Sequence, residues 1–279
     1  MSFSDNKMFY ELVLARKEDE AVSFLKNNPG IDVNFQISST EPFPLYIAAL
    51  SGMTQVVKII LGHPGVEVNC KSYDDHVALS VACRRRRMDI VRFLLEDPRV
   101  DATLYDYKKR TPLFHSVLFE NHDAVKFLIA SGKDLGYVCK DRAQGSYGGV
   151  ENPTVIELTT GLSRHEIAKL LNRFIDDPTQ TSHEIRVELK FPDAVSAEIF
   201  ALIIFLCDDL LQFKHKPDRY VGISLSSAAT IRFLEISKRL PMELQMILCN
   251  RAVGSAKESI TTKNSEPAFK SLVKTLLCS

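Results

Sequence analysis

An apolar pattern recurs along the first part of the chain at a spacing of 34 residues, and this period constrains the fold more than any other feature. Leu45, Leu79 and Leu113 each begin a copy in which one apolar stretch is followed by a second. Two helical stretches in each unit of this length are typical of solenoids, whose units bury a core only by stacking on one another. The second stretch has an aliphatic residue at the same position of five units: Val22, Val57, Val91, Val125 and Ile167.

The residues within each unit agree with this interpretation. A second aliphatic residue follows three positions after each of those five, which places both on one face of a helix. Small residues such as Ala48, Ala82 and Ser116 lie in the first stretch, where they allow helices to approach closely. Acid-containing strings such as residues 66–69 and 100–103 separate the units and are followed by turn-forming residues.

The sequence at residues 110–115, Arg-Thr-Pro-Leu-Phe-His, resembles the opening of an ankyrin repeat, and the strings DIVRFLL and AVKFLIASG resemble its second helix and cap. The resemblance covers about residues 4–174. In that family a proline begins the first helix; Pro44 and Pro112 match it, and Ala78 departs from it. The family's glycine between the two helices is kept at Gly52 but replaced by Arg86 and Glu120, so we expect those two turns to be less regular.

Bulk composition predicts a folded protein with no global electrostatic preference. Apolar residues make up 45% and charged residues 25%, and 35 basic residues balance 35 acidic ones. This balance disfavours nucleic acid and anionic membranes as partners. The longest apolar run, residues 199–207, is too short to span a bilayer, and the amino terminus lacks the order of a signal peptide. Scattered cysteines without a paired motif favour a reducing compartment, so we expect a cytoplasmic or nuclear protein.

The period stops near residue 176, and a second domain over residues 177–279 is predicted. Residues 176–180 are acidic, contain a proline and are the best linker candidate. Residues 185–191 alternate apolar and charged side chains as a strand does, and residues 220–223 are its candidate partner in a short β-hairpin. Helices are predicted over 194–213 and 228–240, from Pro241 to Gly254, and from Ser265 or Glu266 onward. The predicted fold is therefore all-α: an ankyrin-repeat solenoid of about five units over residues 1–176, capped by a small helical module.

Residues 140–153 form a glycine-rich, polar insertion before the fifth unit. One interpretation is a flexible surface loop. The other is a finger that binds a partner, because long insertions are often functional.

Motifs for catalysis are missing from the sequence. No nucleophile elbow, phosphate loop or dinucleotide fingerprint is present, and no two of the seven histidines have a metal-ligand spacing with a supporting carboxylate. We therefore expect no enzyme activity, no cofactor and no metal. His115 is expected to have a hydrogen-bonded structural role.

The resemblance implies a groove lined by the tips of the inter-repeat turns and by the first helices, in which a partner binds. Tyrosine and arginine are enriched at binding hot spots, and residues 84–87 and 108–110 are locally basic. The partner we expect is a protein segment with acidic or phosphorylated character; solvated charge is the alternative for the basic runs. The alignment carries the groove positions to Tyr73, Asp74, His76, Arg84, Arg85, Tyr107, Lys108, Arg110, Leu118 and Phe119.

Two further functions are open at this stage. The basic runs suggest a nuclear import signal or a nucleic-acid contact, although the rest of the repeat face has few basic residues. The spacing of Ile203, Cys207 and Leu211, followed by residues 239–242, resembles the SOCS box of ubiquitin-ligase adaptors. One helical face packed in a core explains that spacing equally well.

Overall fold

The computed structural model describes residues 3–38, 40–136, 142–207, 233–234, 236–237, 239–255, 257 and 259–277. The chain forms two compact units, Met1–Asn172, called here the repeat unit, and Arg173–Ser279, called the C-terminal unit.

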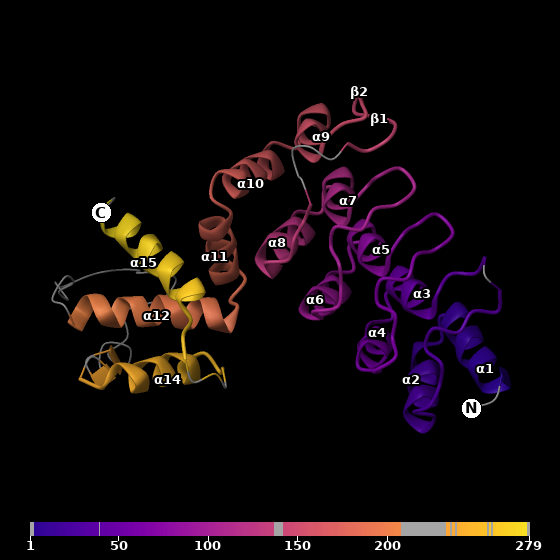
Figure 1. Ribbon diagram of the computed structural model, residues 1–279, viewed down its shortest axis with the longest axis horizontal. Coiled ribbons are helices and arrows are strands. Elements are labelled where there is room, and N and C mark those ends of the chain that lie inside the picture. Colours follow the sequence, from indigo (N-terminus) through magenta and orange to yellow (C-terminus); the bar gives the residue numbers. More distant parts are fainter. Residues whose placement is uncertain are drawn as a thin grey trace. The chain divides into compact units, whose positions relative to one another are not determined.

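The repeat unit is a stack of five helical pairs, which confirms the all-α solenoid predicted from the period. Figure 1 shows the first helices in one row and the second helices in another, with loops projecting between successive pairs. The pairs are α1 (Phe3–Leu14) with α2 (Glu18–Asn27), α3 (Pro44–Ser51) with α4 (Thr54–Leu61), α5 (Ala78–Arg84) with α6 (Met88–Glu96), α7 (Pro112–Leu118) with α8 (His122–Ser131), and α9 (Val155–Gly161) with α10 (His165–Asp176).

Helices α7 and α9 begin at threonine caps. Thr111 Oγ1 accepts a hydrogen bond from Phe114 N at 3.2 Å, and Pro112 occupies the first turn of α7. Thr154 and Glu157 form a reciprocal capping box at the start of α9. Such caps satisfy the free amides of a helix N-terminus, so α7 and α9 begin at the same repeat position.

The turns between paired helices are regular in every repeat, contrary to the expectation for Arg86 and Glu120. Gly52 has a φ of 82°, and Arg86 and Glu120 adopt the same left-handed conformation with φ of 56° and 52°. A side chain in this region costs about 1–2 kcal/mol. The packing of the neighbouring helices determines the backbone conformation of the turn. A residue other than glycine at this position therefore raises the conformational energy of the turn but does not change its conformation.

Asparagines join successive repeats across the acid-containing strings. Asn34 Nδ2 donates to Gly65 O at 2.7 Å, and its Oδ1 accepts from Glu67 N at 3.0 Å. Asn69 makes the equivalent bonds one repeat later, to Arg99 O at 2.9 Å and from Asp101 N at 3.0 Å. These side chains hold neighbouring backbones in register.

The insertion before the fifth repeat is a β-hairpin in the part that the structure describes. Strand β1 (Ser146–Tyr147) pairs antiparallel with β2 (Val150–Glu151). Gly148 and Gly149 form the turn with φ of 57° and 82°, the conformation that a two-residue type I′ hairpin needs. Backbone pairing therefore folds residues 142–153 into a hairpin, and the partner-binding finger stays a prediction.

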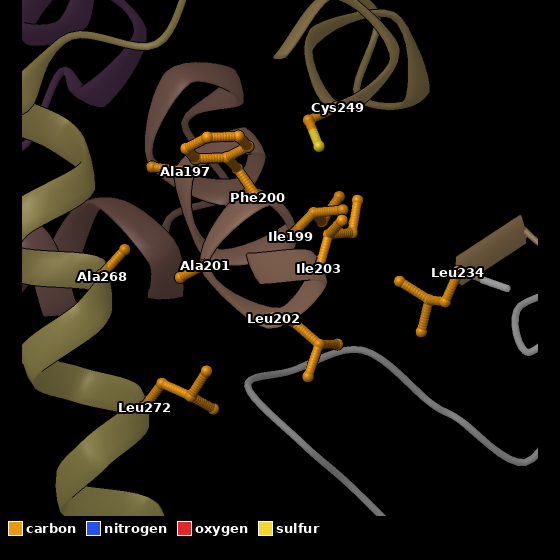
Figure 2. Close-up of a cluster of buried hydrophobic side chains, with 10 residues drawn as sticks. All are labelled: Ala197, Ile199, Phe200, Ala201, Leu202, Ile203, Leu234, Cys249, Ala268 and Leu272. Atoms are coloured by element: carbon orange, nitrogen blue, oxygen red, sulfur yellow. The ribbon is translucent and has the colours of Figure 1, made fainter. Parts of the chain in front are cut away.

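The C-terminal unit is built on α11 (Pro178–Glu188), α12 (Pro192–Cys207), α14 (Met242–Ala252) and α15 (Thr262–Leu277). Figure 2 shows side chains of α12 surrounded by Cys249 of α14 and by Ala268 and Leu272 of α15. A buried polar pair also joins α11 to α12: His183 Nε2 lies 2.5 Å from Glu198 Oε1. Burial raises the pKa of the Glu198 carboxyl, against the effect of His183.

The strand predicted over residues 185–191 is wrong, because most of it belongs to α11. Asp177 caps this helix by accepting a hydrogen bond from Gln180 N at 2.9 Å, and Pro178 occupies the first turn. Ile185 is buried and Leu189 follows four residues later, so the apolar residues also fit one face of a helix. The charged residues between them produced the apparent alternation.

Other boundaries in this unit also differ from expectation. The linker predicted at residues 176–180 consists of the end of α10, the capping residue Asp177 and the start of α11. Helix α15 begins at Thr262, earlier than predicted, and contains Pro267. Pro241 is the N-cap of α14, and Gly254 follows that helix with a φ of 76°. The candidate strand at 220–223 lies outside the described residues. Within the described part of the chain, none of the helices combines the length and apolar character that crossing a membrane requires.

Candidate functional site

The ten predicted groove residues lie at two levels of the repeat unit. One group belongs to the loops between repeats, called fingers here: residues 66–77 and 100–111. The other group lies at the ends of the first helices and is called the palm: Arg84 and Arg85 at the end of α5, and Leu118 and Phe119 at the end of α7, with Leu50 and Ser51 at the equivalent positions of α3.

The two fingers are hydrogen-bonded to each other and present tyrosines at equivalent positions. Tyr107 N lies 3.4 Å from Asp74 O. Tyr73 is 84% exposed and Tyr107 is 52% exposed. The Lys108 ammonium lies 5.5 Å from the centre of the Tyr107 ring. Exposed aromatic rings beside cations provide both contact area and positive charge for a partner.

The palm also combines cations with an aromatic ring. The Arg84 guanidinium lies 5.7 Å from the centre of the Phe119 ring, which is 41% exposed. Tyr46 of α3 lies near Arg84 and Arg85 and was not among the groove residues predicted from the sequence. Partial burial raises the pKa of its phenol, while the nearby Arg84 and Arg85 charges act in the opposite direction.

The four consecutive arginines have different roles. Arg86 donates through Nη2 to Phe119 O and Glu120 O, both at 2.9 Å, and so caps the end of α7. Arg87 packs over Gly52, where an added Cβ would lie 2.9 Å from the guanidinium carbon. Arg86 and Arg87 therefore stabilise turns. Arg84 and Arg85 are the arginines of this run that lie on the palm.

Two of the predicted residues surround Asp106: His76 is buried and Arg110 is partly buried, so both are less exposed than the fingertip tyrosines. Arg110 Nη2 lies 2.7 Å from Asp106 Oδ2, and the side chains of these residues are 14% and 0% exposed. His115 Nε2 lies 3.1 Å from the same oxygen, and His76 Nδ1 lies 3.7 Å from it. Asp106 Oδ1 also accepts from Lys108 N and Arg110 N. This cluster fixes the finger at residues 100–111 to α7.

Burial and pairing shift the pKa values of the cluster in predictable directions. Burial opposes ionisation of Asp106, but the hydrogen bonds from His115 and Arg110 outweigh it and hold the pKa of that carboxyl well below its usual value. Burial lowers the pKa of His76 to about 4, with a further contribution from His115. Burial also lowers the pKa of His115. At neutral pH the cluster therefore contains one ion pair and two neutral imidazoles.

His76, Asp106 and His115 bring three ligand atoms within 4.8 Å of one another, a spacing that a metal ion could use. The surrounding groups do not fit a cation. Arg110 already occupies the Asp106 oxygen that the ion would need, and its positive charge would remain beside the ion. His115 Nδ1 has no hydrogen-bond partner among the described residues, whereas metal-bound histidines almost always have one. Asp106 and His115 form a structural hydrogen-bonded pair, with the His76 ring packed beside them.

A stack of helical pairs joined by projecting fingers defines the class of protein: an ankyrin-repeat solenoid. Residues 45–138 match the family model for ankyrin repeats, in three copies, so this part of the chain consists of ankyrin repeats. The sequence is also 28% identical over 102 residues to transient receptor potential cation channel subfamily A member 1 of Drosophila melanogaster. That similarity covers 35% of this chain and 8% of the channel subunit.

Proposed function

We propose that this protein is a protein-interaction module whose palm and fingers in repeats three and four bind an acidic or phosphorylated segment of a partner. Ankyrin repeats in general mediate binding to other proteins. The observation that carries the specific proposal is the pairing of Arg84 with Phe119 beside Arg85 on one exposed face. This pairing joins apolar area to positive charge, which is the combination that an acidic segment with apolar side chains would recognise.

The fingers extend this surface with Tyr73 and Tyr107. Lys108 lies beside the Tyr107 ring, so the finger at residues 100–111 adds a cation to those of the palm. Arg110 supports the finger through Asp106 and contributes to binding indirectly. We therefore place the direct contacts on Tyr73, Arg84, Arg85, Tyr107, Lys108 and Phe119, with Asp74 and Leu118 at the edge of the face.

A charge-reversal variant tests this proposal. Arg84→Glu, Arg85→Glu and Lys108→Glu together should weaken binding of acidic peptides selected on the full chain from a phage-displayed library of random 12-residue sequences. The loss should be at least about tenfold, because these residues are proposed hot spots. Affinities can be measured by isothermal titration calorimetry with and without phosphorylation of serines in the peptides.

The matched control makes the same change of charge away from the palm. Lys26→Glu, Lys190→Glu and Lys263→Glu alter exposed lysines on other parts of the chain and should leave the affinity within about twofold, because long-range charge effects are screened by salt. An unchanged affinity in the palm variant, or an equal loss in the control, would show that the palm is not the site.

Two other functions are less well supported. A nuclear or nucleic-acid role would use the basic runs. Arg86 and Arg87 of these runs stabilise turns, which leaves fewer cations available to contact a phosphate backbone. A salt-sensitive signal in filter binding would favour it. An adaptor role in ubiquitin ligation through Ile203 conflicts with the burial of that side chain in the core of the C-terminal unit. Co-purification with elongin proteins would be the evidence needed for it.

A further inference from the structure

The β1–β2 hairpin continues the row of fingers and is fixed to the fourth repeat. Gln144 N donates to Lys108 O at 2.6 Å. The Tyr147 ring packs edge-on against Phe114 of α7 with 5.3 Å between ring centres. Its hydroxyl donates to Gln144 O at 3.0 Å and lies 3.5 Å from Arg110 Nη1. Gln144 and Tyr147 therefore attach the first arm of the hairpin to the finger at residues 100–111 and to the start of α7.

The turn of the hairpin packs against the C-terminal end of α9. An added Cβ on Gly148 would lie 2.6 Å from Gly161 O and 2.9 Å from Leu162 Cδ2. An added Cβ on Gly161 would lie 3.0 Å from both Gly148 O and a methyl group of Val150. The hairpin thus folds back on the fifth repeat, and Figure 1 shows it beside α9.

The alignment of the repeats shows which surface of repeat five the hairpin contacts. Thr111 and Thr154 are the N-caps of α7 and α9, so the two helices align residue by residue. Leu118 and Phe119 of the palm then correspond to Gly161 and Leu162 of the fifth repeat. The hairpin tip therefore occupies the palm positions of repeat five.

We propose that the β1–β2 hairpin is the end wall of the binding face, so that the acidic partner segment lies over the palm of repeats two to four and stops at the hairpin. The inference rests on the proposed function for the identity of the face. Charge complementarity favours an acidic segment as the occupant of this face. The cations Arg84, Arg85 and Lys108 all belong to repeats three and four, on the side of the hairpin where the segment is proposed to lie. Gly161 allows the backbone of the hairpin turn to pack closely on α9, since a larger side chain at this position would push the turn away.

Two adjacent glycines allow a sharp test without ligand. Gly148 and Gly149 both have positive φ, but an added Cβ meets Gly161 only from Gly148 and meets nothing within 4 Å from Gly149. Gly148→Ala and Gly149→Ala therefore share the backbone strain and differ in the contact. In Gly148→Ala, hydrogen exchange of the amides in residues 143–153 should be about tenfold faster than in Gly149→Ala. Equal exchange in the two variants would show that the tip does not pack on α9 and would overturn the inference.

The second part of the test uses the acidic 12-residue peptides selected from the phage library. In the unmodified full chain, bound peptide should slow exchange in residues 45–51, 79–85 and 113–119 and leave residues 155–164 unchanged. In Gly148→Ala the protected region should extend into 155–164, and in Gly149→Ala it should not. Protection of 155–164 in the unmodified chain would overturn the end wall while leaving the proposed function intact. A library that yields no peptide dependent on Arg84 and Arg85 would overturn the proposed function and with it the wall's role in binding, while exchange without ligand still reports whether the tip is packed.

Discussion

At the scale of single residues, Asp106 connects the proposed binding surface to the stability of the repeat unit. Its carboxylate accepts hydrogen bonds from its own finger and pairs with Arg110, while the imidazoles of His76 and His115 lie beside it. Removing one partner of a buried ion pair leaves the other charge uncompensated, which is far more costly than the pair is worth. Arg110 is a predicted groove residue that also pairs with Asp106, and we propose that this pair positions Tyr107 and Lys108.

The histidines of this cluster should make the stability of the repeat unit depend on pH. The folded-state pKa of His76 is about 4, below its ordinary value of 6.5, so between these values the unfolded chain binds a proton that the folded chain does not. The free energy of unfolding should therefore fall as pH is lowered from 7 to 4.5, and the lowered pKa of His115 acts in the same direction. Asp106 adds a loss at still lower pH, because its stabilising charge disappears as pH falls through its depressed pKa.

Amide exchange of α5 and α7 measured at several pH values gives this dependence for the repeat unit alone. His76→Gln should reduce its slope between pH 6.5 and 4.5, and His165→Gln, at an exposed position on α10, should not. A slope that is unaffected by His76→Gln would mean that protonation of the cluster does not control stability.

At the scale of elements, the asparagine bridges suggest a stabilising substitution. Asn34 and Asn69 join successive repeats, but Thr103 stands at the next equivalent position. There Lys133 Nζ joins the repeats instead, by donating to Asp97 O and Val100 O at 2.8 and 2.9 Å. Thr103→Asn should restore the bridge to the backbone of Gly132 and Asp134, with a gain of about 1 kcal/mol.

The gain should appear as slower amide exchange in α7 and α8, with little change in α1 and α2, because each repeat contacts only its neighbours. Thr103→Ala is the control, since it removes the hydroxyl without adding an amide and should not stabilise. Equal exchange in the asparagine and alanine variants would rule out the bridge at this position.

The same elements show what the sequence can and cannot predict. Periodicity located the second helices through Val57, Val91 and Val125, because stacking demands the same buried face in each repeat. It failed at residues 185–191, where Ile185 and Leu189 fit a helix and a strand equally and the cap at Asp177 decided between them. The hairpin was not predicted, although Gly148–Gly149 is a type I′ turn signal. His76 and His115 come from different repeats, so no local pattern could show that they meet at Asp106.

At the scale of the whole molecule, the proposed interaction surface depends on the stack of repeats that carries it. A solenoid has no single core; each repeat buries its apolar face against the next, and the terminal repeats need a polar or covered outer side. The hairpin satisfies this need on the palm side of repeat five. The apolar residues Ile167 and Leu171 of α10 are also buried. The prediction that the C-terminal unit caps the solenoid concerns the remaining side of this repeat.

Capping can be tested by separating the chain after α10. A fragment of residues 1–177 keeps all five helical pairs. If the C-terminal unit covers the end of the stack, this fragment should lose about 1–2 kcal/mol of stability relative to the full chain. The loss should be greatest in α9 and α10 and small in α1 and α2, as measured by amide exchange in each segment.

Addition of residues 178–279 as a separate chain should restore part of the protection, which distinguishes covering of the end from an effect of chain length. Identical exchange in α9 and α10 of the fragment and the full chain would show that the hairpin and α10 complete the stack by themselves, so that the C-terminal unit is available for a function of its own.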